Sequence, residues 1–255
     1  MNLAGLVEKS LAGLCLSPEE SLAVLRWDDG RLLELLEAAF QVRKAHFGLK
    51  VALHLLINAK SGLCAEDCAY CSQSSVSQAE IERYPLLDEE AVLEGARAAR
   101  EAKAVRYCIV TSGRAPTAPE VRRLCQVVRH IKSEVDISIC TSLGFLTPEM
   151  ALELKAAGVE RYNHNLNASP RFYGQICTTH SYGDRLQTLR QARQAGLELC
   201  SCALFGMGER EEDIVELALA LRELHPDSLP VNFYHPIPGT PLEKVNYLTL
   251  SKASI

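Results

Sequence analysis

Between residues 51 and 71 the chain reads Val51-Ala-Leu-His-Leu-Leu-Ile57-Asn-Ala-Lys60-Ser-Gly62-Leu-Cys64-Ala-Glu-Asp-Cys68-Ala-Tyr-Cys71. The apolar, β-prone start predicts a strand, and Gly62 marks the loop that follows it. Three cysteines in this loop have C-x3-C-x2-C spacing. Three thiolates so spaced can hold a 4Fe–4S cluster and leave its fourth iron without a protein ligand. Because an iron with an open position can bind and reduce a small molecule, the spacing indicates a reactive site.

Two other uses of these cysteines stay open on spacing alone. A structural zinc site needs four closed ligands, usually paired C-x2-C knuckles or cysteines with histidines. The nearest candidate for the fourth is His54, which lies in an apolar segment upstream. A disulfide pair with one free thiol is the second alternative. The spacing favours the cluster over both.

Strand-like and helix-like segments alternate from residue 51 onward. Apolar, β-prone segments predict strands over residues 51–57, 106–111, 135–141, 159–165, 197–204 and 230–235. Amphipathic patterns predict helices near residues 88–103, 117–132, 147–157, 183–195 and 210–224. This alternation is typical of an α/β fold with a parallel sheet, either doubly wound or closed into a barrel. In such barrels the loops at the carboxyl ends of the strands build the active site.

The first fifty residues predict helices instead. Ser17-Pro18-Glu19-Glu20 is a capping box with proline at the first helical position, and Gly48 is a stop signal after a periodic apolar segment. No linker or low-complexity segment interrupts the rest. We therefore expect a helical extension over residues 1–50 and one domain over residues 51–255.

Composition narrows the class of protein. A net charge of −5 over 255 residues argues against a general nucleic-acid binder. The first residues lack the features of a secretory signal, and no apolar run approaches the roughly 20 residues that cross a bilayer. We expect a cytoplasmic protein with no nucleic-acid and no membrane partner. In a reducing compartment, ten cysteines indicate metal or redox chemistry rather than disulfides.

A second set of cysteines lies on the predicted strands: Cys108, Cys140, Cys200 and Cys202. Because side chains alternate along a strand, Cys200 and Cys202 are expected on one side. If that side is the interior, four thiols converge there and could hold a second cluster, or they could simply pack as small core residues. Cys15, Cys125 and Cys177 are interpreted as ordinary packing or surface cysteines, although Cys177 lies in a polar loop.

Polar residues also lie at predicted strand ends. Asn165 and Asn167 follow the fourth strand with period two, and an inward amide can grip ribose hydroxyls or a urea-like carbonyl. The neighbouring His164 is interpreted as a satisfied structural histidine. Arg185 opens a helix and could clamp a carboxylate, or be a solvated surface arginine. Asn232, inside an apolar strand, needs a polar partner.

The cysteine motif resembles that of radical S-adenosylmethionine (SAM) enzymes, and residues 58–74 around it are similar to the biotin synthase family. Further motifs carry the same resemblance, in order and over residues 51–242: Tyr162-Asn163-His164-Asn165-Leu166, Phe172-Tyr173-Gly174, Thr178-Thr179, Gly206-Met207-Gly208-Glu209 and Gly239-Thr240-Pro241-Leu242.

The resemblance implies a TIM-type (β/α) barrel with two clusters. The 4Fe–4S cluster at Cys64, Cys68 and Cys71 would bind SAM and generate a 5′-deoxyadenosyl radical, which takes hydrogens from dethiobiotin before sulfur insertion gives biotin. It implies roles for other residues: Cys108, Cys140 and Cys200 on the auxiliary cluster, Asn165 and Asn167 at the SAM ribose, Arg185 at its carboxylate, and Asn232 with Asn165 against dethiobiotin. A reducing flavodoxin or ferredoxin and a possible homodimer are the expected partners.

The chain also departs from the family pattern. Cys202 stands where glycine is common, and the arginine that usually completes a 2Fe–2S auxiliary cluster would come after residue 255. We therefore expect a four-cysteine auxiliary 4Fe–4S cluster, with 2Fe–2S as the alternative. Asn167 replaces a frequent aspartate, which weakens a ribose hydrogen bond. Six strands are expected, with residues 246–252 ending before a seventh, so the barrel would be incomplete.

Two other functions stay open beside sulfur insertion. One is a biotin-synthase-like radical SAM enzyme that acts on another small carboxylic acid. The other is a truncated, non-catalytic iron–sulfur protein. Inward thiols on three strands favour the sulfur-inserting enzyme, because an enzyme without sulfur insertion has no need of them.

Overall fold

The computed structural model describes residues 2–62 and 64–245, so the prediction for residues 246–252 lies outside the described residues. The helices are α1 (Leu3–Leu11), α2 (Pro18–Leu25), the 3-10 helix η1 (Asp29–Arg31), α3 (Leu32–Phe47), α4 (Glu89–Glu101), α5 (Ala118–Glu134), α6 (Pro148–Ala157), α7 (Pro170–Ile176), α8 (Tyr182–Gln194) and α9 (Glu211–Leu224). The strands are β1 (His54–Lys60), β2 (Arg106–Thr111), β3 (Ser138–Ser142), β4 (Arg161–Asn163), β5 (Glu198–Cys200), β6 (Ala203–Phe205) and β7 (Val231–Phe233).

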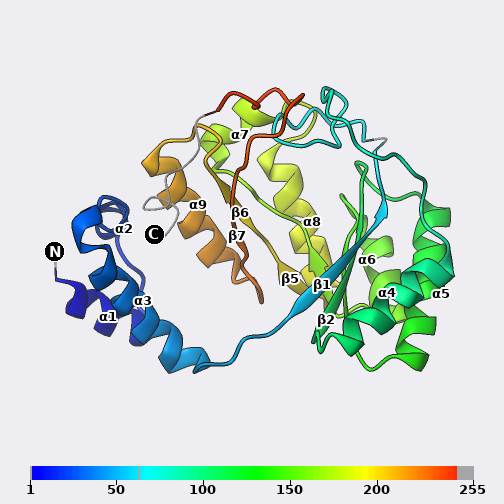
Figure 1. Cartoon of the computed structure of the whole chain (residues 1–255), viewed down its shortest axis with the longest axis horizontal. Helices are drawn as coiled ribbons and strands as arrows, with labels where there is room; N and C mark the ends of the chain where they lie inside the picture. The colour runs from blue at the N-terminus through cyan, green and yellow to red at the C-terminus, as the bar shows by residue number, and fades with distance from the viewer. Residues whose placement is uncertain (1, 63, 246–255) are drawn as a thin grey trace.

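All strand pairs are parallel, in the order β1-β2-β3-β4-β5 with a separate β6-β7 pair. Single bridges from Asn167 to Ala203 and from Cys200 to Ser228 link the pair to the larger sheet. The strands follow one curved surface, and α4, α8 and α9 contact them from its outside (Figure 1). The predicted parallel α/β fold is confirmed. Among the described residues, the helices with extensive strand contacts (α4, α8 and α9) lie outside the curve, as in a barrel and not in a doubly wound sheet.

The two faces of the sheet differ in chemistry. Residues Tyr107, Ile109, Ile139, Tyr162 and Leu199 are fully buried and belong to one apolar cluster with the helices. Side chains alternate along a strand, so their neighbours Cys108, Cys140, Arg161, Asn163 and Cys200 face the interior of the curve. The apolar face therefore anchors the helices, and the interior face is left for chemistry.

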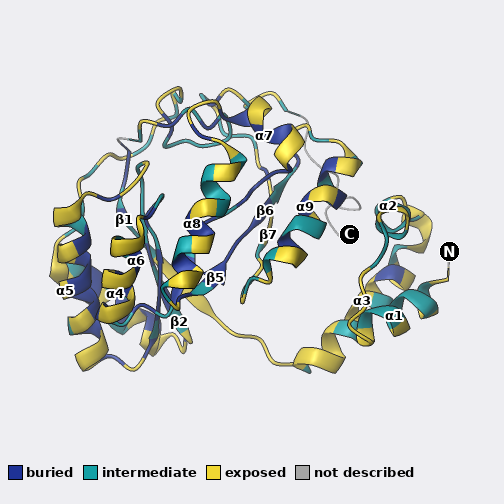
Figure 2. Ribbon diagram, turned by 180° about the vertical axis from the view of Figure 1, so that it is seen from behind, coloured by how far each residue is buried: buried dark blue, intermediate teal, exposed yellow. Residues whose placement is uncertain are grey.

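Helix α5 shows how local sequence sets the outer layer. Its capping box joins Thr117 and Glu120, with a proline in the first turn. Val121, Leu124, Val128 and other apolar residues at helical spacing form its buried face, while most of its charged residues stay exposed (Figure 2). The helix predicted near residues 117–132 is confirmed within two residues.

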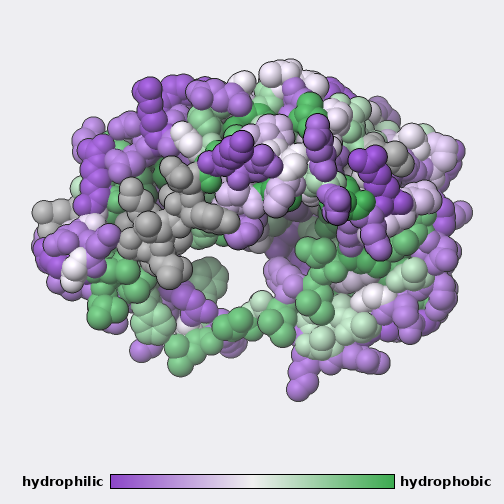
Figure 3. Space-filling model, turned by 45° about the horizontal axis from the view of Figure 1, so that its top comes forward, coloured by the Kyte–Doolittle hydropathy of each residue, from purple (hydrophilic) through white to green (hydrophobic). Residues whose placement is uncertain are grey.

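Several strand boundaries differ from the prediction. The first strand starts at His54 rather than Val51, because Val51 and Leu53 belong to an exposed segment that links α3 to β1. Hydrophobic residues gather on this segment in Figure 3. The predicted strand over residues 197–204 is divided at Ser201 and Cys202, which have no strand geometry. Among the described residues, the division gives seven strands in place of six predicted ones, and β1 and β2 keep their predicted lengths.

Helix α7 was not predicted. Ser169 caps it by accepting a hydrogen bond from the amide of Phe172, and Pro170 occupies its first turn. Phe172, Tyr173 and Ile176 are buried under the cysteine loop.

None of the described helices is both long and apolar enough to cross a membrane.

Candidate active site

A cavity of about 350 Å³ lies at the carboxyl ends of the strands. Predicted site residues from four separate segments line it: Cys64, Cys68, Cys71, Asn165, Asn167, Arg185 and Asn232. A larger cavity, of about 720 Å³, lies between α2, α9 and the β6-β7 pair. Its lining is mainly aliphatic and includes none of the predicted site residues, so the smaller cavity is the candidate active site.

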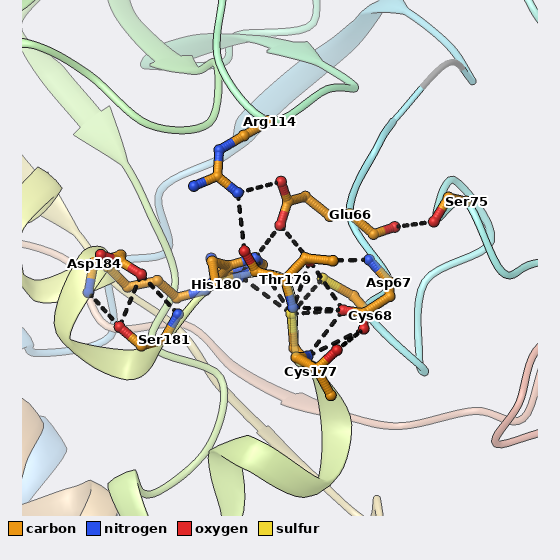
Figure 4. A network of polar contacts seen from close by, with 12 residues as sticks. Glu66, Asp67, Cys68, Ser75, Arg114, Cys177, Thr179, His180, Ser181 and Asp184 are labelled. Atoms are coloured by element: carbon orange, nitrogen blue, oxygen red, sulfur yellow. Dashed lines mark hydrogen bonds and ion pairs between the residues drawn. The ribbon is translucent and has the colours of Figure 1, made fainter.

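The loop that carries the cysteine motif is tied to the segment after α7. The amide of Ala69 donates to the carbonyl of Ile176 at 2.8 Å. Asp67 accepts hydrogen bonds from the amides of Thr178 and Thr179 at 2.9 and 3.1 Å, and from both hydroxyls (Figure 4). Burial alone would raise the pKa of Asp67, but these hydrogen bonds outweigh it and hold that pKa well below its usual value.

The buried Glu66 also links the cysteine loop to the segment after α7. Its carboxylate accepts from Arg114 Nη1 at 2.7 Å and from Thr179 Oγ1 at 2.6 Å, and it pairs closely with His180 Nδ1 (Figure 4). Burial raises the pKa of Glu66, and these partners more than offset it, so the carboxyl stays ionised. Two adjacent carboxylates therefore fix the cysteine loop against residues 177–180.

Replacing Asp67 by alanine should loosen this loop. Both amides and the Thr178 hydroxyl lose their acceptor, while the Thr179 hydroxyl keeps Glu66. We expect a loss of about 1–3 kcal/mol in the free energy of unfolding. Denaturant unfolding measures it, with Asp136→Ala as a matched control because that carboxylate is almost fully exposed in a surface ion pair. The control should change stability by less than about 0.5 kcal/mol. Equal effects of the two variants would contradict the role of Asp67.

The thiols of the motif are partly withdrawn from water. Burial, together with the adjacent Cys177 thiol, raises the pKa of Cys68 to about 12, and burial raises the pKa of Cys71. In the part of the chain that the structure describes, Cys64, Cys68 and Cys71 do not come within the 4.8 Å of one another that a single ion would need. Wider spacing suits a cluster, whose several irons each take one thiolate. The donor set therefore fits a cluster better than zinc.

Arg185 lies at the centre of the polar side of the cavity. Its Nη1 donates to the carbonyl of Asn165 at 2.9 Å, its Nη2 lies 3.0 Å from His180 Nε2, and its Nε donates to the Tyr173 hydroxyl. The guanidinium is therefore held rigidly beside the thiols. The alternative of a solvated surface arginine is wrong, because these partners are internal.

The three predicted amides occupy the same cavity. Asn167 has a left-handed backbone (φ 65°), which asparagine tolerates, and its Nδ2 donates to the Tyr70 hydroxyl at 2.6 Å. Asn165 Oδ1 accepts from the amide of Cys202 at 3.2 Å. Asn232 Nδ2 donates to Cys202 Sγ at 3.1 Å. Asn165 and Asn232 thus join the cavity to Cys202.

The environment of His164 differs from the predicted one, a structural histidine with all its hydrogen bonds made. It is buried and lines the cavity, yet its Nε2 has no hydrogen-bond partner among the described residues. Burial holds its pKa well below the usual value, so the ring is neutral. A satisfied structural histidine is therefore the wrong interpretation at this atom. A buried polar atom without a partner at the cavity wall fits a site that receives a polar ligand.

The interior thiols lie deeper than the cavity. Cys108 and Cys140 are register partners on β2 and β3, and a hydrogen bond with Cys108, together with burial, raises the pKa of Cys140. Cys200 ends β5 on the same face, close enough to Cys140 to raise its own pKa further. Cys202 lies in the break after β5, so the period-two argument that paired it with Cys200 does not apply. Burial and the neighbouring Cys200 raise the pKa of Cys202 to about 12.

Two arginines accompany these thiols on the interior face. Arg106 precedes Cys108 on β2, and Arg161 is the register partner of Cys140 on β4. Both pair with Glu198, at 3.1 and 2.8 Å. Their positive charges lower the pKa values of Cys140 and Cys200, against the larger effects that raise them.

Sequence reasoning missed Glu66, Asp67, Tyr70, Tyr173 and His180. Glu66 and Asp67 lie inside the cysteine motif, and the motif was interpreted from its thiols alone. His180 completes a Cys-x2-His spacing with Cys177, which is a signal that could have found it. Cys177 itself is not an isolated packing cysteine, since its Sγ lies 3.8 Å from Cys68 Sγ.

Comparisons with known proteins agree with this site. The family model described as Radical SAM superfamily matches residues 60–221. A biotin synthase from Halalkalibacterium halodurans is 48% identical over 249 residues, covering 98% of this chain and 75% of the relative. A biotin synthase from Magnetococcus marinus is 50% identical over 244 residues, covering 96% of this chain and 76% of the relative.

Solved structures show the same fold at lower identity. The crystal structure of methylornithine synthase superposes with a TM-score of 0.86 at 24% identity, covering 98% of this chain and 74% of that one. The FeFe-hydrogenase maturase HydG from Carboxydothermus hydrogenoformans gives a TM-score of 0.81 at 22% identity, covering 98% of this chain and 61% of that one. The cysteine motif, the residues gathered around its cavity and these matches lead to one conclusion: the chain belongs to the biotin synthase family of the radical SAM superfamily.

Proposed function

We propose that the chain is a radical SAM sulfurtransferase that converts dethiobiotin to biotin. One observation carries the proposal: Asn165 and Asn232, which line the cavity that holds the cysteine motif, both bond to Cys202, and Cys202 lies close to the second set of thiols on the interior face. An enzyme that only cleaves SAM has no use for that second set. The near-50% identity to biotin synthases supports dethiobiotin as the substrate.

Cys64, Cys68 and Cys71 would hold the 4Fe–4S cluster. When bound, the cluster supplies the electron that cleaves SAM to the 5′-deoxyadenosyl radical, which takes hydrogen from dethiobiotin. Arg185, fixed by Asn165 and Tyr173, would pair with the SAM carboxylate. Asn165 and Asn167 would hold the ribose, and Asn232 with Asn165 would hold dethiobiotin. His164 lines the same cavity.

Cys108, Cys140, Cys200 and Cys202 would hold the auxiliary cluster, whose sulfur is consumed. Their placement on or beside three strands of one interior face supports this set. Because Cys202 supplies a fourth thiol, the 4Fe–4S form is the proposed one, with 2Fe–2S as the alternative. A flavodoxin or ferredoxin donor, a homodimer, a cytoplasmic location and the division at residue 50 stay predictions.

Anaerobic reconstitution tests the function. The loaded chain, given SAM, a reductant and dethiobiotin, should release 5′-deoxyadenosine and biotin, with about eight irons per chain if both clusters are 4Fe–4S. Release of 5′-deoxyadenosine without biotin would instead favour an enzyme for another small carboxylic acid. No 5′-deoxyadenosine from a fully loaded chain would reject the radical SAM chemistry and leave a non-catalytic iron–sulfur protein.

Replacing Asn167 by aspartate should strengthen SAM binding. The two side chains have the same shape, and both tolerate the left-handed backbone. A carboxylate would make a charge-assisted hydrogen bond to a ribose hydroxyl in place of a neutral one. We expect the KM for SAM to fall about fivefold, or about 1 kcal/mol. The KM for dethiobiotin is the internal control and should not change; an unchanged KM for SAM would place Asn167 away from the ribose.

A further inference from the structure

A buried group of metal-ligand side chains lies beside the cysteine motif without a part in the proposed reaction. Cys68 Sγ is 3.8 Å from Cys177 Sγ, and Cys177 Sγ is 3.6 Å from His180 Nε2. One ligand atom from each of the three residues lies within 4.8 Å of the other two. Within residues 2–62 and 64–245, no other set of histidine, cysteine and acidic side chains is this compact.

These distances match the edges of a tetrahedral metal site. With zinc–sulfur bonds of about 2.3 Å, two thiolates on one tetrahedral ion are about 3.8 Å apart. A thiolate and an imidazole nitrogen on the same ion are about 3.6 Å apart. Two of the three donor–donor distances therefore match a single-ion site, and the third is below 4.8 Å, whereas the thiols of the cysteine motif are not grouped so closely.

The surroundings of His180 also suit a metal ligand. Cys177 Sγ lies 3.3 Å from His180 Nδ1 and 3.6 Å from Nε2. Glu66 pairs with Nδ1, so Nε2, which now lies 2.9 Å from the Tyr173 hydroxyl, is the nitrogen that would bind the metal. A carboxylate on the far nitrogen of a histidine fixes the ring and strengthens it as a ligand. Asp67 Oδ1, 3.1 Å from Cys177 Sγ, is the nearest fourth donor.

Two arginines oppose a cation here: Arg114, which is paired with Glu66, and Arg185. The Nη2 of Arg185 lies 3.0 Å from the same Nε2 that would bind the metal. When a metal takes that nitrogen, the guanidinium keeps the Asn165 carbonyl and the Tyr173 hydroxyl as partners. Two thiolates offset its charge, so the site can hold a divalent ion beside it.

We propose that the chain, before its cluster is assembled, binds one divalent transition-metal ion through Cys68, Cys177 and His180. Thiolate and imidazole donors select ferrous iron or zinc over magnesium and calcium. Cys68 also belongs to the cysteine motif, so the single ion and the cluster exclude each other at this thiolate. Ferrous iron bound here is stored next to the cluster site, whereas zinc bound here blocks cluster assembly.

Cobalt(II), whose thiolate complexes are coloured, is the probe for this site. The full chain carrying Cys108→Ser and Cys140→Ser, which removes two auxiliary thiols, is prepared reduced and metal-free. We expect one tightly bound cobalt(II) per chain. Cys177→Ser and His180→Ala should each weaken its binding by about 100-fold or more, because even changes around metal ligands cost about 10–100-fold. Circular dichroism confirms that each variant is folded, and Cys177→Ser is the milder of the two changes.

Cys64→Ser is the matched control, because Cys64 belongs to the cysteine motif and not to the proposed site. It should leave cobalt(II) affinity unchanged. If Cys64→Ser weakens binding and Cys177→Ser does not, the ion lies on the cysteine motif and the proposal is wrong. Absence of tight binding in the starting variant also overturns it.

Competition with cluster assembly gives a second measurement. One equivalent of zinc should slow the incorporation of iron and sulfide in the natural chain, and should slow it much less in Cys177→Ser. Equal inhibition of the two chains would contradict the proposal. Neither measurement depends on biotin formation, so this inference and the proposed function can fail separately.

Discussion

Replacing Cys71 by alanine is expected to end SAM cleavage. The variant loses one of three thiolates that would hold the SAM-binding cluster, and no other thiol lines that part of the cavity in the described chain apart from Cys64 and Cys68. Release of 5′-deoxyadenosine should fall by well over about 100-fold, because even changes around metal ligands cost about 10–100-fold. Anaerobic turnover with SAM and dithionite measures the product, and iron analysis should show the loss of one cluster.

The matched control is Cys15→Ala, since Cys15 is an exposed cysteine in the loop before α2. It should keep full iron content and full 5′-deoxyadenosine release. If Cys71→Ala still releases 5′-deoxyadenosine at the unmodified rate, the cysteine motif does not hold the reactive cluster. The whole assignment of the cavity would then be wrong.

Replacing Cys140 by alanine should separate the two halves of the reaction. Cys140 lies on the interior face, paired in register with Cys108, and does not line the cavity. We therefore expect SAM cleavage to persist while biotin formation falls by about 100-fold or more. Parallel measurement of 5′-deoxyadenosine and biotin shows the separation. Loss of both products with a folded, iron-loaded protein would contradict a separate role for the interior thiols.

Cys202→Gly distinguishes the two forms of the auxiliary cluster. Glycine restores the common family residue, so a three-cysteine 2Fe–2S site should survive it. A four-cysteine 4Fe–4S site should lose iron, and Mössbauer spectra should change accordingly. Asn232 donates to Cys202 Sγ in the metal-free chain, and Asn232→Ala with Cys202 retained is the control for the loss of that hydrogen bond alone. An unchanged spectrum in Cys202→Gly would exclude Cys202 as a ligand.

Strand–helix alternation made most of the fold predictable, because period two and period 3.6 are local properties of the sequence. The ends of the strands were less predictable where backbone hydrogen bonds to distant residues determine them. The strand predicted over residues 197–204 divides because the amide of Ser201 donates to Ser228 while the carbonyl of Cys202 accepts from Asn167. These hydrogen-bond partners lie far away in sequence, so the local pattern of residues 197–204 could not predict them.

The site residues were likewise predictable where sequence spacing identifies them, and not where tertiary contacts do. Cys64, Cys68 and Cys71 could be found from spacing, and alternation along the strands placed Cys108, Cys140 and Cys200 on one face. The ties made by Glu66 and Asp67 to residues 177–180 could not be found, because the two segments are more than 100 residues apart. Only the folded chain brings the Cys-x2-His spacing of Cys177 and His180 against Cys68.

Arg106 and Arg161 have a consequence for the electron affinity of the interior site. Both arginines pair with one carboxylate, that of Glu198. The interior face next to Cys108, Cys140 and Cys200 therefore carries an excess of positive charge. An iron–sulfur core with four thiolates is an anion, and nearby positive charge makes its reduction easier. The proposed auxiliary centre should therefore have a higher reduction potential than the same core in a neutral shell. Such a centre is well placed to take up the electron that is left over when a new carbon–sulfur bond forms.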